Sequence, residues 1–178
     1  FVKHYYPQLS KKALIIDDRG NGGGNVSPMI IERLQRTITY FSMHTNQKEG
    51  DVNPVGTFQG PKVLLINEYS ASDGDLFPYR FKYSKLGTVI GHRTWGGVVG
   101  YSGTVPVVDG GSIVTPSYAP FAADGSGFII EGTGVTPDID LANDPYKEFS
   151  GEDEQLNKAI ETIKQQMKDY KYLSPTIP

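Results

Sequence analysis

Residues 62–75 read Lys62-Val63-Leu64-Leu65-Ile66-Asn67-Glu68-Tyr69-Ser70-Ala71-Ser72-Asp73-Gly74-Asp75, and we expect the rest of the chain to be arranged around this stretch. Its first part, 63–66, is a continuous apolar run typical of a strand buried on both faces. Small and polar residues follow and predict a sharp turn. The aromatic-rich segment after the turn is compatible with a helix.

Ser72 lies in this turn and has two interpretations. A serine there can present its hydroxyl at the edge of a sheet, where the N–H groups of the next helical turn can hold a negative charge. The pattern is that of a nucleophile elbow in which Ser70 replaces the first glycine of G-x-S-x-G. Ser72 and Asp75 also form an S-x-x-D capping pattern, the commoner role of a serine before a helix. The stretch alone leaves both interpretations open.

A second strand candidate, 13–18, leads into the glycine-rich loop 19–25. A phosphate-binding loop is excluded because no Lys-Ser/Thr pair follows Gly24. A dinucleotide fingerprint also fails because Asn25 occupies the third glycine position. Two interpretations remain: a loop whose exposed N–H groups receive a carbonyl oxygen, or a tight turn that packs the strand against a helix.

The rest of the chain predicts further short elements and a long polar loop over 43–61. Residues 1–10 can end a helix before Pro7. Other helices are expected over about 27–40, 76–86 and 152–170, and strands over 88–91, 104–108, 112–115, near 117–121 and near 127–131.

Composition excludes several classes of protein. The 178 residues suffice for one domain or most of one. The net charge of −3 and the lack of a basic run give no indication of nucleic acid binding, and no apolar run has membrane-spanning length. The chain has no cysteine, which excludes disulfides and thiolate chemistry. His4, His44 and His92 are expected to be surface or packing residues, so neither a metal site nor a cofactor is predicted.

The chain opens at Phe1 without an initiator methionine or a signal segment. We therefore expect it to be a piece of a longer protein. The sequence does not decide the compartment or the oligomeric state, and a homo-oligomer stays open.

Four motifs together resemble the tail-specific and tricorn serine proteases. Residues 17–24 resemble their D-x-R-x-N-x-G-G loop, and 67–75 resemble their nucleophile turn. Residues 90–97 resemble the I-G-x-x-T-x-G segment, and 131–138 resemble the closing G-V-x-P-D turn. The motifs occur in the order and spacing of the family.

The resemblance implies roles for particular residues. Gly97 stands where the tail-specific branch has the lysine of its Ser–Lys dyad, so the tricorn branch, with Ser–His–Ser–Glu, fits better. There the nucleophile matches Ser72 and the glutamate matches Glu131. The backbone oxyanion donors match Asp73 and one of two glycines, Gly22 or Gly23. The histidine and second serine belong to an upstream segment that this chain does not contain.

The resemblance also implies fold, substrate and context. It predicts a ClpP/crotonase-like α/β spiral of ββα units, with residues 1–178 forming a single, partial domain: the C-terminal part of a catalytic core. Upstream domains of the same parent chain are expected partners, peptides or unfolded proteins are the expected substrate, and the isolated piece should be nearly inert without its base. Asp51, in the 36–60 segment that corresponds to the family's specificity pocket, could select basic side chains.

Two alternatives remain. A non-catalytic relative could use the same cleft to bind a peptide or lipid, but binding needs neither Ser72 nor Glu131. CoA thioester chemistry on a crotonase-like scaffold shares the oxyanion logic and gains nothing from Ser72.

Overall fold

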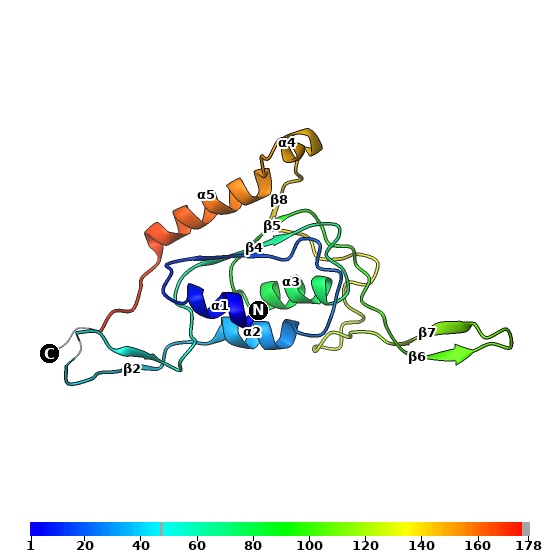
Figure 1. The fold of residues 1–178 in the computed structure, drawn as a ribbon, viewed down its shortest axis with the longest axis horizontal. Helices are drawn as coiled ribbons and strands as arrows, with labels where there is room; N and C mark the ends of the chain where they lie inside the picture. Colours follow the sequence, from blue (N-terminus) through cyan, green and yellow to red (C-terminus); the bar gives the residue numbers. More distant parts are fainter. Residues whose placement is uncertain (47, 176–178) are drawn as a thin grey trace.

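A four-stranded parallel sheet forms the centre of the computed structural model, which describes residues 1–46 and 48–175 (Figure 1). The strand order is β1-β4-β5-β8, with β1 at Leu14–Asp17, β4 at Lys62–Ile66, β5 at Thr88–Gly91 and β8 at Ile139–Asp140. The neighbouring strands are parallel throughout. The predicted α/β class is confirmed, and both predicted strands are present. Only β4 is buried as predicted; β1 is an edge strand whose residues are half-buried or exposed, so the prediction that it is buried was wrong.

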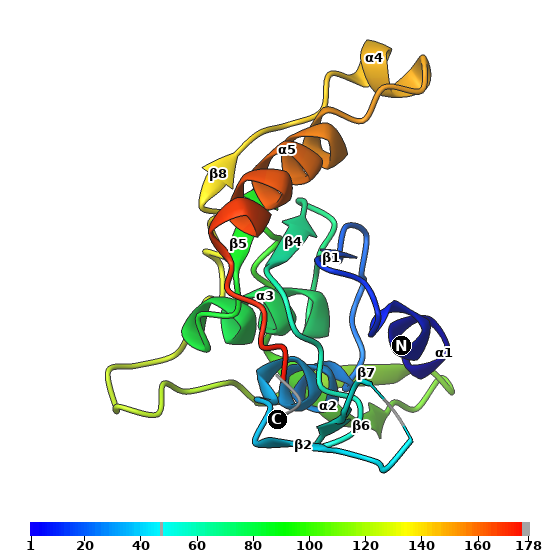
Figure 2. The same cartoon turned by 90° about the vertical axis from the view of Figure 1, so that its left-hand side faces the viewer.

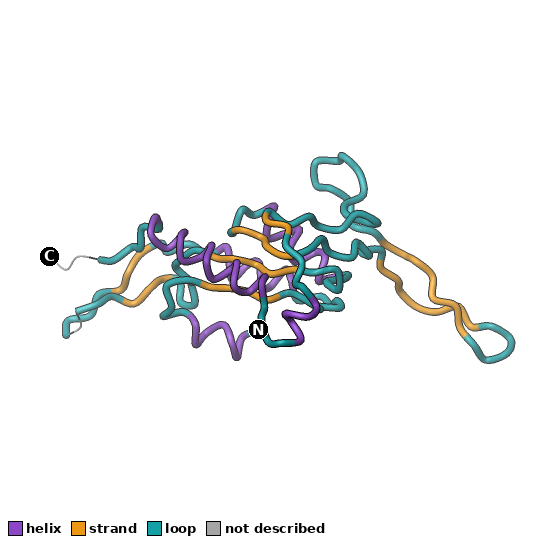
Figure 3. Tube along the Cα trace, turned by 90° about the horizontal axis from the view of Figure 1, so that it is seen from above, coloured by secondary structure: helices purple, strands orange, loops and turns teal. Residues whose placement is uncertain are grey.

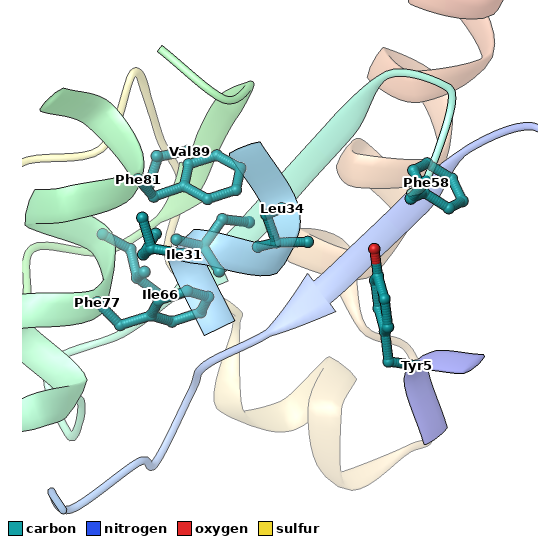
Figure 4. Close-up of a cluster of buried hydrophobic side chains, with 9 residues drawn as sticks. Tyr5, Ile31, Leu34, Phe58, Ile66, Phe77, Phe81 and Val89 are labelled. Carbon is teal, nitrogen blue, oxygen red and sulfur yellow. The ribbon is translucent and has the colours of Figure 1, made fainter. Parts of the chain in front are cut away.

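Helices cover both faces of the sheet (Figures 1 and 2). The helices α2 (Ser27–Gln35) and α3 (Asp73–Tyr83) lie on one face, and α5 (Glu154–Asp169) lies on the other. Strand β4 is fully buried because its side chains alternate between the two layers. On the α2–α3 side, the core consists of Tyr5, Ile31, Leu34, Phe58, Leu64, Ile66, Phe77, Phe81 and Val89 (Figure 4). On the α5 side, it consists of Val63, Leu65, Ile90, Ala159 and Ile163.

Two antiparallel hairpins extend from opposite ends of the body (Figures 1 and 3). One joins β2 (Tyr40–Ser42) to β3 (Asp51–Asn53), and the other joins β6 (Gly100–Pro106) to β7 (Ser112–Tyr118). The short helices are α1 (Val2–Tyr5), the 3₁₀ turn η1 (Tyr6–Gln8) and α4 (Pro145–Phe149). Within the described residues, no helix is long and apolar enough to cross a membrane.

Several predicted boundaries were wrong. Helix α2 ends at Gln35 rather than near residue 40, because Arg36 is extended and Thr39 donates its N–H to the Asn53 carbonyl. The residues after it form β2, whose partner β3 interrupts the predicted loop over 43–61; residue 47 of that loop lies outside the described residues. Of the strands expected near 117–121 and 127–131, residues 117 and 118 extend β7, and beyond them one bridge joins Phe121 to Phe128.

The parallel sheet brings three loops to one edge. The glycine loop follows β1, the turn with Ser72 follows β4, and the segment 92–99 follows β5. Because β1, β4 and β5 are adjacent and parallel, their carboxyl ends meet at the same edge, where open α/β sheets bind ligands.

Candidate functional site

The glycine loop and the nucleophile turn are in direct contact. The Asn21 carbonyl accepts the Ala71 N–H at 2.8 Å, and the Asn67 Oδ1 accepts the Gly20 N–H at 3.0 Å. A Cβ on Gly74 would lie 2.1 Å from the Asn21 carbonyl oxygen, so only glycine permits this approach. The two loops therefore lie on the same side of the sheet.

Ser72 is exposed between these loops and has a rare backbone conformation. Its φ is 56° and its ψ is −114°, a region that few residues other than glycine adopt. A Cβ on Gly23 would lie 2.9 Å from the Ser72 Cβ and 3.3 Å from its Oγ, so the glycine loop passes directly beside this side chain.

The capping box between Ser72 and Asp75 is present, as the sequence predicted, and its well-formed half is the Asp75 Oδ2 that accepts the Ser72 N–H at 2.9 Å. The Asp75 N–H donates to the Ser72 carbonyl at 2.9 Å, so the Ser72 hydroxyl keeps its proton to donate to a base and the two interpretations do not compete.

Backbone donors without an acceptor occur in the two segments next to this hydroxyl. Asp73 is the first residue of α3, and its N–H has no acceptor among the described residues; the same holds for the N–H of Gly22. The N–H of Gly23 donates to the Asn21 Oδ1 at 3.1 Å. The amino end of a helix and an exposed glycine loop together suit an anion or a developing oxyanion.

Two carboxylates, those of Asp73 and Asp18, are buried next to the loops. The Asp73 carboxylate accepts the N–H groups of Val26 and Ser27, both at 2.9 Å, and the Ser27 hydroxyl. It thereby joins the start of α2 to the start of α3. Asp18 is 5 % exposed, and its Oδ2 has no hydrogen-bond partner among the described residues. Burial raises the pKa of Asp18 to about 8, and the nearby Asp73, Asp17 and Asp75 add to the rise.

Glu131 holds the segment that follows β5. Its Oε2 accepts the N–H groups of Val98 and Val99 at 2.7 and 2.8 Å. Its Oε1 has no partner in the part of the chain that the structure describes. The segment reaches the nucleophile turn, because the Gly97 carbonyl accepts the Ser72 N–H at 3.1 Å. Glu131 is therefore linked to Ser72 through two residues of backbone.

Comparison with known proteins decides the family. Residues 2–141 match the family model described as Peptidase family S41. The chain belongs to peptidase family S41. It is 40% identical over 177 residues to the tricorn protease of Thermoplasma volcanium, a match that covers 98% of this chain and 17% of the relative. It is 31% identical over 146 residues to the chloroplastic C-terminal processing peptidase of Tetradesmus obliquus, which covers 76% of this chain and 31% of that protein.

The S41 chain also matches a solved tricorn protease structure with a TM-score of 0.86 and 35% identity, covering 94% of this chain and 16% of the solved one. The chain thus spans less than a fifth of the tricorn relatives named here. The predicted family and the predicted fold class are confirmed.

Gly97, which the resemblance matched to the lysine of the tail-specific branch, lies beside the candidate nucleophile Ser72. Gly97 accepts the Ser72 N–H through its carbonyl and has no side chain to act as a base. Among the described residues, no hydrogen bond joins a histidine to Ser72: His44 contacts Asp51 and His92 contacts Asp140, both at 3.1 Å. Both histidines lie at the surface beside a carboxylate, which agrees with the prediction that they are surface or packing residues.

Asp51 does not join the site within this chain. It lies on β3, in the hairpin at the opposite end of the molecule from β6 and β7 (Figure 1), and its carboxylate contacts His44. Its proposed part in specificity therefore stays a prediction. No group of three or more His, Asp or Glu side chains in the described ranges could hold a metal ion.

The sequence did not predict the hydrogen bonds that the buried carboxylates form with the backbone of the loops. It predicted Asp75 only as a cap, and it did not indicate that Asp18 is buried. The signal for Asp75 was its position three residues after Ser72, but its second set of contacts, to Gly96 and Gly97, comes from residues 21 and 22 positions further along the chain.

Proposed function

We propose that this S41 chain carries the nucleophile, the oxyanion donors and the glutamate of a tricorn-like serine peptidase. In this proposal Ser72 attacks the carbonyl carbon of a peptide bond. The backbone N–H of Asp73 and that of Gly22 or Gly23 stabilise the resulting oxyanion. The general base is a histidine from an upstream segment of the parent chain, and Glu131 orients it through a second serine.

The contact between Gly23 and Ser72 carries the proposal. It supports the proposal because the exposed Ser72 side chain, at the amino end of α3, neighbours the glycine loop. Pre-aimed oxyanion donors are worth about 2.7–4 kcal/mol each in transition-state stabilisation. The unpaired Oε1 of Glu131 supports its part, since one oxygen anchors the chain and the other is left for a hydroxyl.

The same proposal includes three further points. Residues 1–178 form a single domain, the substrates are peptides or unfolded proteins, and upstream domains of the parent chain are its partners. Without the histidine, the isolated chain should be nearly inert, because removing the base of a triad lowers turnover by several orders of magnitude.

Covalent labelling of the full-length parent tests the proposal. A fluorophosphonate should modify Ser72, as located by peptide mass spectrometry, and Ser72→Ala should abolish both label and peptidase activity. Ser84→Ala is the matched control, because Ser84 caps the opposite end of the same helix. If Ser72→Ala retains all peptidase activity, the protein is not a Ser72 peptidase. If instead the parent takes no label and binds peptide without cleaving it, the non-catalytic alternative holds.

A further inference from the structure

Asp75 lies fully buried beneath the nucleophile turn, with an exposed fraction of 0%. Its Oδ2 accepts the N–H of Ser72 at 2.9 Å and that of Gly97 at 3.1 Å. Its Oδ1 accepts the N–H of Gly96 at 2.7 Å. Within the described residues, no Lys, Arg or His forms an ion pair with it. Three peptide N–H groups and the amino end of α3 therefore balance its charge.

The backbone of Ser72 needs such an anchor. A residue other than glycine is strained in this conformation and keeps it only where its surroundings enforce it. The Ser72 N–H is held twice, by the Asp75 carboxylate and by the Gly97 carbonyl. The first acceptor belongs to Asp75. The second, the Gly97 carbonyl, is held in place by Asp75, because the Asp75 Oδ2 also accepts the N–H of Gly97.

The same carboxylate fixes the segment that reaches Glu131. Gly96 and Gly97 are bound by Asp75, and the next two residues, Val98 and Val99, are bound by Glu131. A return contact closes the loop, because the Gly96 carbonyl accepts the N–H of Gly132 at 2.7 Å. Two acidic residues thus hold four consecutive peptide groups.

We propose that Asp75 is a positioning residue for the reaction: its carboxylate sets the position of Ser72 relative to Glu131 through the segment 96–99. The inference rests on the proposed function, because it concerns the geometry of that same site. Asp75 is buried and does not contact the substrate, so it acts through the residues that it holds.

Both side-chain oxygens of Asp75 must accept hydrogen bonds to hold these N–H groups. Asn in place of Asp75 keeps the shape but exchanges one acceptor for an NH₂ group. That group would face either the Gly96 N–H or the N–H groups of Ser72 and Gly97, donor against donor. The 96–99 segment should then shift away from the nucleophile turn, and a shift of about 1 Å can cost about 10²-fold in rate.

Steady-state kinetics on the full-length parent tests this role. For Asp75→Asn, kcat should fall about 10²-fold while KM changes by less than about 3-fold, since the substrate surface is intact. The pH profile of kcat/KM should keep its shape at a lower plateau, because the titrating base is unchanged. Asp138→Asn is the matched control: Asp138 also accepts a peptide N–H, that of Val89 at 2.8 Å, but within the sheet. It should lose thermal stability and keep kcat.

Gly96→Ala provides a second route if Asp75→Asn does not fold. Gly96 has a φ of +87°, and an added Cβ would lie 2.5 Å from the Gly134 nitrogen, so its N–H must move off the Asp75 Oδ1. The same loss in kcat is expected with Asp75 intact. A folded variant of either kind with wild-type kcat and wild-type labelling of Ser72 overturns the positioning role and leaves the proposed function standing. Absence of labelling in the wild-type parent overturns the proposed function itself.

Discussion

Asp18→Asn should change how the stability of the 178-residue chain depends on pH. The Asp18 carboxyl is buried at the end of β1, where its Oδ1 accepts the Asn21 side-chain N–H at 2.9 Å and its carbonyl accepts the Ser70 hydroxyl. Burial raises its pKa from 3.8 to about 8. The folded chain thus binds a proton more tightly than the unfolded chain does.

The sign and size follow from linkage. Between about pH 4 and about pH 8 the folded state holds a proton on Asp18 that the unfolded state has lost, so the free energy of unfolding falls as pH rises. The slope is about 1.4 kcal/mol per pH unit, and over this interval the loss reaches roughly 6 kcal/mol. That is comparable with the whole stability of a small domain, about 5–15 kcal/mol.

Urea unfolding followed by circular dichroism measures this at several pH values from 4.5 to 9. Asn at position 18 cannot titrate, and its Oδ1 can keep the contact to Asn21. Its buried NH₂ group has no acceptor, which lowers the free energy of unfolding by about 1–3 kcal/mol at every pH. The variant should be the less stable protein near pH 4.5 and the more stable one near pH 9. Asp169→Asn, which removes an exposed carboxylate, controls for net charge. Parallel curves for wild type and Asp18→Asn would refute the reasoning.

Three further predictions concern the site and the core. In the full-length parent, Glu131→Gln should lower kcat by about 10²- to 10⁴-fold in peptide hydrolysis, because an NH₂ group then replaces the Oε1 that is proposed to accept from the second serine. An unchanged kcat would remove Glu131 from the mechanism. Gly23→Ala should slow fluorophosphonate labelling at least about 10-fold, since the methyl group meets Ser72, whereas Gly24→Ala, with a similar φ and nothing within 4 Å, controls for backbone strain; equal rates in the two variants would contradict the contact. Phe81→Ala should destabilise the chain by about 3–5 kcal/mol in urea unfolding, because Phe81 is fully buried against both α2 and the sheet; a loss below about 1 kcal/mol would contradict this packing.

The sequence predicted the parts of the fold that local pattern controls. The apolar run 63–66 is buried on both faces because it is a central strand of a parallel sheet. The helix predicted over 152–170 forms as α5, and it buries Gln155, Ala159 and Ile163. Helix α2 was predicted too long because Ile38 continues the helical spacing, although Thr39 pairs with Asn53 across a strand contact that the local pattern does not contain.

The site could be predicted only as a set of candidates. The motifs placed Ser72 and the glycine loop after two strands, but whether the loops meet depends on the strand order, in which β1 and β4 are neighbours. The network around Asp75 and Glu131 could not be predicted, because each carboxylate is satisfied by peptide N–H groups that any residue type would offer.

A crystal structure of the full-length parent with a phosphonate bound to Ser72 tests the central claim most directly. The claim is that the Ser72 hydroxyl, the N–H of Asp73 and an N–H of the glycine loop converge on one carbonyl-sized position. We expect the phosphonyl oxygen within about 2.7–3.1 Å of the Asp73 nitrogen and of the Gly22 or Gly23 nitrogen. A phosphonyl oxygen pointing into solvent, with both N–H groups turned away from it, would contradict the account.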